Sequence, residues 1–572
     1  MHILLVASAF NSLTQRVLAE LQDRGHTVGV ELALGNDDAL REAVRRHSPR
    51  LIVAPMLTTA IPEDIWTAHT CLIVHPGPPG DRGPSSLDWT LQGGVESWGV
   101  TVLEAVAEMD AGDVWAWSPL KVPPMAGKSD LYRGEVADAA IDAVLLAVER
   151  FASGKYKPKR QKAADLAAGW RPFLKQAERR IDWATQSTKS VLRQLRAADS
   201  QPGVLDELLG EKWYLHGGHL EDELRGAPGE LIACRAGAIC RATVDGAVWI
   251  PQLRPWREPG SALPSYKLSA VEALGDLLPF EVPEVPVPLQ LPAGRRTWTD
   301  IRYSENGAVG VLNFSFPGGA MSTVQCRRLL EAYRFAKTRP TSVLVLGGVR
   351  DFFSNGIHLN VIEAADDPAE ESWANIHAMN DLVEAVLTTT DRLTVAALGG
   401  NAAAGGVMLA LAADEVWCRD GAVLNPHYTL MGLHGSEYWT YTLPRRVGES
   451  EAQRLTQSAL PVSAKRAVEL GMAERVLQVA PEELGDEVAR LAAQLAASPN
   501  LAARIEKKKA ARAQDESVKP LQQYRDEELA HMRRNFFDAS EPHRVLRSAF
   551  VRKEKALHTP PHVARLGLDL GE

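Results

Sequence analysis

The chain has 572 residues, which is too long for a single hydrophobic core and predicts about three to five domains. Hydrophobic residues make up 45% and charged residues 24% of the sequence, the balance of an ordinary globular protein. The net charge of −9 is spread along the chain without a basic block, which argues against nucleic acid as the main partner.

Cysteine usage and apolar runs place the protein in the cytoplasm. The five cysteines form no CxxC pair and no cluster with histidines, so no metal site is expected and a reducing compartment is favoured. The N-terminal run MHILLVASAF lacks a cationic leader and predicts a strand, not a signal peptide. Residues 393–413 carry no charge, but their glycines and alanines favour a strand, a turn and a buried helix over a membrane span.

The first third of the sequence alternates between apolar strands and amphipathic helices. The runs ILLVASA, HTVGVELA, RLIVAPM and TCLIVHPG predict strands, and residues 12–21 and 37–47 predict helices between them. This order implies a doubly wound parallel sheet, an α/β domain over residues 1–164, with ligands beyond the carboxyl ends of its strands. The first turn lacks GxGxxG, so a nicotinamide dinucleotide is not expected.

The remainder of the chain divides into four parts. Residues 165–258 combine one helix with short strand-like runs and glycine turns, which predicts a small β-barrel. Residues 259–298 are proline-rich and predict an extended linker. Residues 299–545 contain repeated strand–helix units and long helices, which predict a second α/β core with a helical tail, and residues 546–572 form a C-terminal tail. The expected fold class is therefore α/β multidomain.

Two segments of the first domain carry a family resemblance. The loop CLIVHPGPPGDRGPSSLDW and the segment WGVTVLEAVAEMDAGDVWAW resemble the catalytic domain of the 10-formyltetrahydrofolate-dependent transferases and hydrolases, which include methionyl-tRNA formyltransferase. The resemblance extends through the barrel to about residue 256. It implies 10-formyltetrahydrofolate as formyl donor, His75 as the group that moves a proton and Asp110 as the carboxylate beside it. The alternative makes His75 a loop residue and Asp110 a turn former.

One position departs from that family. Its catalytic asparagine lies two residues before the histidine, where this sequence has Ile73, and an apolar side chain cannot donate to an oxyanion. Loss of such a donor costs about 3–4 kcal/mol in transition-state stabilisation. The candidate replacements are Asn11, Gln15 and Arg133. The resemblance places folate along APMLTTAIP, at Met56, Leu57 and Thr58, with Arg82 and Arg133 near its glutamate tail or a phosphate.

A second resemblance covers residues 300–545. The runs VGVLNFSFPGGAMS, VLGGVRDFFSNGIHLN and AALGGNAAAGGVMLALAADEVW resemble the crotonase (enoyl-CoA hydratase/isomerase) superfamily, whose fold is a ββα spiral. The resemblance implies coenzyme A as ligand. It also implies two backbone N–H donors for a thioester oxygen, at Asn355 beside Gly356 and at Gly405 beside Gly406.

The acids that a hydratase needs are missing from this part. Met408 and His427 occupy the two positions where the family carries glutamates, so addition of water is not expected. The ionisable groups left nearby are His427, Tyr428 and Glu437, with Tyr438 beside them. We expect Glu437 or Tyr428 to handle a proton, although tyrosines and a histidine also fill cores.

The two halves together resemble the HypX/HoxX hydrogenase maturation proteins along nearly the whole chain. That resemblance implies transfer of a formyl group from folate to CoA, decarbonylation of formyl-CoA, and delivery of CO to the iron of [NiFe]-hydrogenase with the help of other maturation proteins. Two alternatives stay open. One is a formyl-folate hydrolase or transferase with a CoA-binding regulatory domain, and the other is a non-catalytic maturation scaffold.

Overall fold

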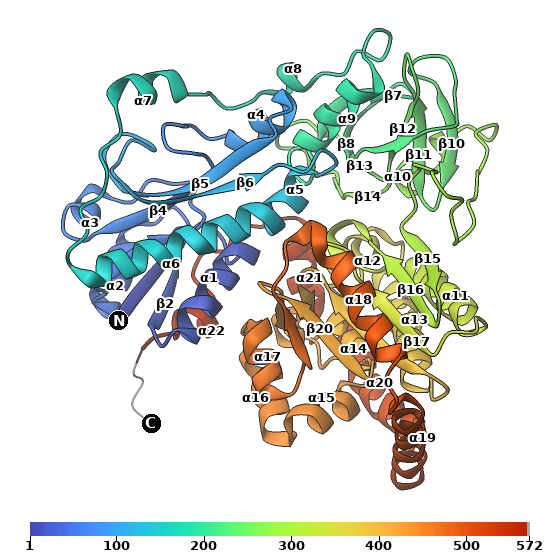
Figure 1. Ribbon diagram of the computed structural model, residues 1–572. Coiled ribbons are helices and arrows are strands. Elements are labelled where there is room, and N and C mark those ends of the chain that lie inside the picture. The colour runs from blue at the N-terminus through green and yellow to red at the C-terminus, as the bar shows by residue number, and fades with distance from the viewer. Residues whose placement is uncertain (569–572) are drawn as a thin grey trace. The chain divides into compact units, whose positions relative to one another are not determined.

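The computed structural model describes residues 1–568 and divides into two compact units (Figure 1). The N-terminal unit comprises Met1–Leu231, Arg241–Ile250 and the residues from Lys555 onward. The C-terminal unit comprises Ile232–Cys240 and Pro251–Glu554. Each unit has its own central sheet, as the two resemblances predict.

A six-stranded sheet forms the centre of the N-terminal unit, in the order β2-β1-β3-β4-β5-β6. Its strands are β1 (His2–Ala7), β2 (Thr27–Leu32), β3 (Leu51–Ala54), β4 (Cys71–His75), β5 (Ser97–Glu104) and β6 (Val114–Lys121). The first four strands run parallel, as predicted. β5 and β6 are antiparallel to their neighbours, so the sheet is mixed and not wholly parallel.

Alternation along β1 explains how helices cover both faces of this sheet. Ile3 and Leu5 belong to a core shared with α1 and α6, whereas Leu4 and Val6 belong to a second core shared with α2 and α3. The helical elements are α1 (Ser12–Asp23), α2 (Asp37–His47), α3 (Glu63–Trp66), α4 (Ser86–Gly93), α5 (Lys128–Leu131), a π-helical turn η1 (Tyr132–Val136) and α6 (Ala137–Ser153).

The segment after the sheet consists of short helices and short strands, and its strands belong to two four-stranded sheets. The small β-barrel stays a prediction. The helices and strands are α7 (Ala163–Gly169), α8 (Gln176–Arg179), α9 (Thr188–Ala197), β7 (Val204–Leu208), β8 (Glu211–His216), β9 (His219–Glu221), β10 (Leu231–Arg235), β11 (Ala238–Ala242), β12 (Ala247–Ile250) and β13 (Gln252–Pro255). β7 pairs antiparallel with β8, and β9 with β12.

The proline-rich linker is mostly extended but not featureless. It contains β14 (Leu268–Ser269), α10 (Ala270–Leu274) and a 3-10 turn η2 (Gly275–Leu277). Backbone bonds from Cys234 N–H to Pro283 O (2.8 Å) and from Val285 N–H to Cys234 O (2.9 Å) attach it to β10. These bonds hold in place a segment whose prolines cannot donate to a ladder.

The C-terminal unit has a six-stranded sheet in the order β15-β16-β17-β18-β20-β23 and a three-stranded sheet β19-β21-β22. The strands are β15 (Ile301–Asn306), β16 (Val309–Phe314), β17 (Val343–Gly347), β18 (Leu393–Leu398), β19 (Ala402–Ala403), β20 (Glu415–Arg419), β21 (Val423–Asn425), β22 (Val462–Ser463) and β23 (Arg475–Leu477). Only the β15–β16 pair of the large sheet is antiparallel.

Helices of the C-terminal unit cover both faces of its large sheet. Val343 and Val345 of β17 face a core shared with α18, while Leu344 and Leu346 face a larger core shared with α11 and α13. The helices are α11 (Thr323–Lys337), α12 (Leu359–Ala364), α13 (Pro368–Leu387), α14 (Gly405–Leu411), α15 (Trp439–Val447), α16 (Glu449–Ser458), α17 (Ala464–Leu470), α18 (Leu484–Ala496), α19 (Leu501–Val518), α20 (Leu521–Phe537) and α21 (His543–Val551). Three 3-10 turns accompany them: η3 (Pro317–Gly319), η4 (Tyr428–Met431) and η5 (Pro481–Glu483).

The uncharged stretch from Leu393 to Ala413 forms β18, a glycine turn, β19 and the buried helix α14, as predicted. Within residues 1–568, no helix has both the length and the apolar character needed to cross a bilayer.

Residues 559–564 pack within the N-terminal unit. Helix α22 (Pro561–Ala564) lies against β2, and Val563 is fully buried in the core of that unit. The Thr559 hydroxyl donates to Glu31 Oε1 (2.7 Å) and accepts from the Leu32 N–H (2.9 Å). Part of the predicted tail, residues 546–572, is therefore an integral piece of the first domain.

Candidate active sites

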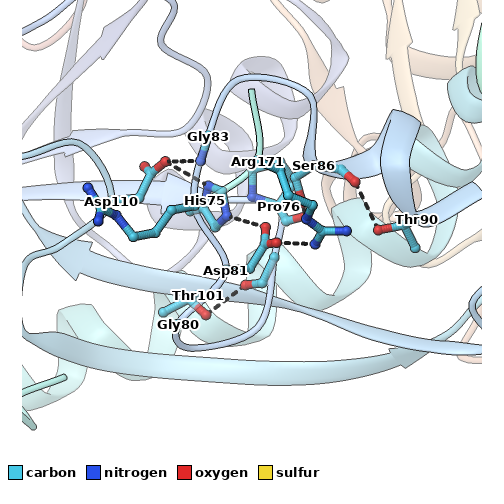
Figure 2. A network of polar contacts seen from close by, with 12 residues as sticks. His75, Pro76, Gly80, Asp81, Gly83, Ser86, Thr90, Thr101, Asp110 and Arg171 are labelled. Carbon is cyan, nitrogen blue, oxygen red and sulfur yellow. Dashed lines mark hydrogen bonds and ion pairs between the residues drawn. The ribbon is translucent and has the colours of Figure 1, made fainter. Parts of the chain in front are cut away.

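His75 lies at the carboxyl end of β4, where the parallel strands of the N-terminal sheet are expected to hold ligands. It is only 4% exposed, and each ring nitrogen faces a carboxylate: Nε2 is 2.8 Å from Asp81 Oδ2 and Nδ1 is 3.5 Å from Asp110 Oδ2 (Figure 2). Gly77 makes this possible, because a Cβ there would overlap both Asp81 Oδ2 and His75 Nε2. The orientation of the ring is therefore fixed from both sides.

Asp81 is the residue of this site that sequence reasoning missed. Besides His75, its carboxylate pairs with Arg171, from the segment after α7 (Figure 2). Burial opposes ionisation, but the hydrogen bonds from His75 and Arg171 outweigh it and hold the pKa of Asp81 below its usual value. The sequence signal was present in the HPGPPGDRG loop, but it places the aspartate six residues from the histidine and does not show that the loop folds back.

Asp110 is both of the things that the sequence suggested. It is a turn residue with a left-handed backbone (φ 55°), and its carboxylate lies beside His75. The same Oδ2 accepts from the Gly83 N–H at 3.0 Å. Gln161 supports the turn by donating to the Asp110 carbonyl oxygen (3.1 Å) while it accepts from the Gly80 N–H (2.8 Å). The structure thus brings His75 and Asp110 together as predicted.

The three candidate replacements for the missing asparagine have different surroundings. Asn11 caps α1 by accepting from the Thr14 N–H, and its Nδ2 donates to the Tyr132 hydroxyl at 3.2 Å. Gln15 donates to the Phe10 carbonyl oxygen (3.0 Å). Arg133 lies in the π-helical turn η1, a geometry that is frequent at functional sites, and donates to Ser129 Oγ at 3.5 Å. Ile73 itself is half-buried on β4 between β3 and β5.

The segment predicted to hold the folate follows β3. The Met56 carbonyl oxygen accepts from the Ser8 N–H (2.9 Å), and the Thr58 N–H donates to Ser8 Oγ (2.8 Å), so the loop is tied to the end of β1. Leu57 lies between them and is partly exposed. Arg82, the other predicted contact, is 7% exposed and donates to the Met109 and Leu166 carbonyl oxygens and to Glu108. Its guanidinium thus clamps the loops around His75, and contact with folate stays a prediction.

In the C-terminal unit, glycines bring the FSNG segment and the start of α14 together. A Cβ on Gly356 would lie 3.2 Å from the Gly405 nitrogen, and one on Gly406 would overlap the Ser354 carbonyl oxygen. The position predicted for the first N–H donor requires a correction, because the Asn355 N–H already donates to Gly319 O at 2.7 Å. The N–H groups of Ile357 and Gly405 have no hydrogen-bond acceptor within residues 1–568, so these two are the donors available at this place.

Glu437 and Tyr428 form a buried pair beside Gly405. The Tyr428 hydroxyl donates to Glu437 Oε2 at 3.0 Å, and the Ser436 N–H donates to the same oxygen at 3.1 Å. The other oxygen, Oε1, points at Gly405, where any Cβ would overlap it. Burial raises the pKa of Glu437 to about 7, and burial together with the nearby Glu437 carboxylate keeps the pKa of Tyr428 well above its usual value of 10.

The turn that presents Glu437 is strained. Both Glu437 (φ 59°) and Tyr438 (φ 58°) adopt left-handed backbone conformations, which cost about 1–2 kcal/mol each for residues other than glycine. Asn380 of α13 accepts from the Glu437 N–H (2.8 Å), and Glu528 of α20 accepts from the Tyr438 N–H (2.9 Å). Sequence reasoning missed both residues, because neither lies near a motif.

His427 is half-buried and directly precedes the 3-10 turn η4, which begins at Tyr428. No group of three or more His, Cys, Asp or Glu side chains that could hold a metal ion occurs in the part of the chain that the structure describes.

Comparison with known proteins finds similarities in both halves of the chain. The chain matches the Enoyl-CoA hydratase/isomerase family over residues 305–557 and the Formyl transferase, C-terminal domain family over residues 174–261. It is 26% identical over 188 residues to methionyl-tRNA formyltransferase of Streptococcus pneumoniae, which covers 33% of this chain and 59% of that protein.

Two further matches span the whole chain. The hydrogenase maturation factor HoxX of Bradyrhizobium diazoefficiens is 46% identical over 568 residues, 99% of this chain and 97% of that protein. The crystal structure of HypX from Aquifex aeolicus in complex with tetrahydrofolic acid is 43% identical, with a TM-score of 0.93 over 98% of both chains. The chain belongs to the HypX/HoxX family of hydrogenase maturation factors.

Proposed function

We propose that the protein makes carbon monoxide from 10-formyltetrahydrofolate in two steps, for the iron of a [NiFe]-hydrogenase. The formyl group passes to the sulfur of coenzyme A at the His75 site, and formyl-CoA then loses CO at the Glu437 site. The observation that carries the proposal is the free oxygen of the Glu437 carboxyl, buried and aimed at the Gly405 N–H region. The names of the relatives support the role in maturation and the use of folate.

At the first site, the CoA thiol attacks the formyl carbon, and the bond to N10 of the folate breaks. The leaving nitrogen needs a proton, and the thiol gives one up. His75, held between Asp81 and Asp110, is suited to carry that proton. Ile73 cannot stabilise the oxyanion, so we assign that task to Asn11, Gln15 or Arg133, and we assign the loop at 56–58 to the pterin.

At the second site, the N–H groups of Ile357 and Gly405 hold the thioester oxygen, a role that the family resemblance had given to Asn355 and Gly405. Glu437 takes the formyl proton, and the electrons of the C–H bond stay on the carbon of CO. The C–S bond breaks at the same time, and the electron pair of that bond leaves with sulfur. The products are CO and a CoA thiolate, which then receives the proton from Glu437. Tyr428, whose hydroxyl donates to Oε2, leaves Oε1 as the oxygen that accepts the proton.

Hydration is disfavoured because it needs two carboxyl groups at the substrate. Met408 and His427 replace the family's glutamates, and the Glu528 carboxylate already accepts from four hydrogen-bond donors of the turn at 436–440. The Glu437 site is therefore equipped to remove one proton without adding water.

The test is to incubate the pure protein with tetrahydrofolate carrying a 13C-formyl group and with CoA, and to assay the headspace for labelled CO and the solution for labelled formate. Labelled CO supports the proposal. Formate without CO supports a formyl-folate hydrolase with a CoA-binding regulatory domain. The absence of both products supports a non-catalytic scaffold. A second assay supplies formyl-CoA directly, so that loss of CO release can be assigned to one site. Tyr428→Phe is expected to abolish CO release in both assays, and normal release from this variant would remove Tyr428 from the mechanism.

A further inference from the structure

We propose that Glu528 of α20 is a positioning residue for Glu437: it holds the left-handed turn that aims the Glu437 carboxyl at Gly405. This inference rests on the proposed function, in which Glu437 is the base. Glu528 lies 91 residues downstream and is 1% exposed.

Four donors from the turn converge on the Glu528 carboxylate. Oε2 accepts from the Tyr438 N–H (2.9 Å) and lies 3.3 Å from Ser436 Oγ. Oε1 accepts from the Thr440 N–H (2.9 Å) and the Thr440 hydroxyl (2.5 Å). The bonds thus bracket Glu437 on both sides along the chain, and they bind the backbone that carries it.

Asn380 of α13 holds the turn from a second helix. Its Oδ1 accepts from the Glu437 N–H (2.8 Å), and its Nδ2 donates to Ser436 Oγ (2.9 Å). Two consecutive left-handed residues persist only where the surroundings over-determine them. Here α13 and α20 supply every side-chain partner of the backbone N–H groups at 437, 438 and 440.

All four donors to Glu528 are neutral. Within the described residues neither Glu528 nor Glu437 forms a salt bridge, so two carboxyl groups share one buried region without a cation. A carboxylate used only for structure would normally have a positive partner when buried this deeply. The arrangement instead places a second acid where its charge acts on Glu437.

The electrostatic consequence agrees with this placement. Burial raises the pKa of Glu528 to about 7, and the charge of Glu528 adds to the burial that raises the pKa of Glu437. The other titratable groups that face the pair are Tyr428 of η4, Cys326 of α11, and Tyr438, whose hydroxyl donates to Glu384. Arg525 also pairs with Glu384, beyond Tyr438.

The test compares Glu528→Gln with wild type in the full chain. Turnover of formyl-CoA to CO is followed against pH, and infrared difference spectroscopy follows the protonated carboxyl band that Glu437→Gln removes. We expect kcat to fall at least about tenfold, because displacing a base by 1 Å slows proton transfer far more than it weakens substrate binding. KM should stay within about twofold of the wild-type value. The midpoint of the Glu437 band is expected to move to lower pH, because the neighbouring negative charge is gone.

Each alternative outcome decides the question. Unchanged turnover together with an unchanged midpoint overturns the inference. If wild type releases no CO, the proposed function fails, and the infrared midpoint alone tests the coupling of the two acids. Thr440→Val removes the hydroxyl that donates to Glu528 Oε1 and so makes Glu528 harder to ionise. The midpoint of the Glu437 band should therefore move to lower pH, by less than in Glu528→Gln. If Glu528→Gln does not fold, the absence of this shift in Thr440→Val overturns the inference. Asp526→Asn, an exposed acid on the same helix, is the control and should change neither reading.

Discussion

Each of the two candidate sites buries a carboxyl group, but the surroundings shift the pKa values of these two carboxyls in opposite directions. Asp81 has a guanidinium as partner and a pKa below its usual value, so it stays negatively charged beside His75 at neutral pH. Glu437 has only neutral donors and a second acid nearby, and its pKa is raised to about 7. The difference fits the two proposed steps, because a stable negative charge supports an imidazole, whereas a base must exchange its proton near neutral pH.

The largest effect is expected from Glu437→Gln, which removes the proton acceptor and keeps the shape of the side chain. CO release from formyl-CoA should fall by about 10²–10⁴-fold, the usual contribution of a general base. Formyl transfer should persist, measured as tetrahydrofolate formed in the presence of CoA. Equal loss of both activities would mean that the two sites do not divide the reaction as proposed.

Two glycines offer a matched steric comparison. Gly77→Ala places a methyl group against Asp81 and His75, and Gly405→Ala places one against Glu437 Oε1. Displacing reacting groups by 1 Å costs about 10²-fold, so each variant should lose its own step by about that factor and leave the other step intact.

The controls are Gly93→Ala and Gly485→Ala, where a methyl group meets only an ordinary contact or open space and the backbone is not left-handed. Tetrahydrofolate formation and CO release are measured for all four variants. A loss of both steps in any of them would contradict independent sites.

A smaller effect is expected when the cation beside Asp81 is removed. Arg171→Gln should raise the pKa of Asp81 toward its usual value by about one unit, since an adjacent guanidinium lowers the pKa of an aspartate by 1–3 units. The acidic limb of the formyl-transfer rate should then move to higher pH by the same amount. CO release from formyl-CoA, measured over the same pH range, serves as the reference and should not move.

The smallest effect concerns stability against pH. The folded pKa values of Glu437 and Glu528 lie above the unfolded value of 4.5, so the stability that their protonated forms contribute is present below pH 4.5 and is lost as pH rises through 7. The contribution of Asp81 has the opposite sign: it is present above pH 3.8 and lost on acidification.

Between pH 5 and 8, the Tm of wild type should therefore fall by a few degrees relative to a Glu437→Gln, Glu528→Gln double variant. Parallel Tm curves over that range would show that neither acid titrates there.

Local patterns predicted much of this protein, and contacts between distant segments account for what they missed. Alternating apolar runs predicted β1 to β4 correctly. The family motifs pointed to His75, Asp110 and Gly405, and Glu437 was proposed as an ionisable group near the missing acids; the roles of these residues stay predictions. The sequence did not reveal that β5 and β6 reverse direction, because strand periodicity is the same for parallel and antiparallel pairing.

The partners of the site residues were harder to predict. Asp81 contacts His75 only because the loop turns back at Gly77, and Glu528 and Asn380 reach the Glu437 turn from helices 91 and 57 residues away. The motif predicted a free N–H at Asn355, but this N–H donates to the carbonyl oxygen of Gly319, 36 residues earlier in the chain. The periodicity of apolar residues predicts the helix or strand to which a residue belongs. It does not predict which other helix or loop that residue contacts.

The return of the chain to its first domain has a consequence for biosynthesis. Val563 fills the core of the N-terminal unit, and Thr559 binds Glu31 and the Leu32 N–H at the end of β2. While the chain emerges from the ribosome, these groups lack their partners until more than five hundred further residues have been translated. Completion of the N-terminal unit is thereby coupled to synthesis of the chain as far as α22, and a product truncated before Thr559 would carry an unfinished N-terminal unit.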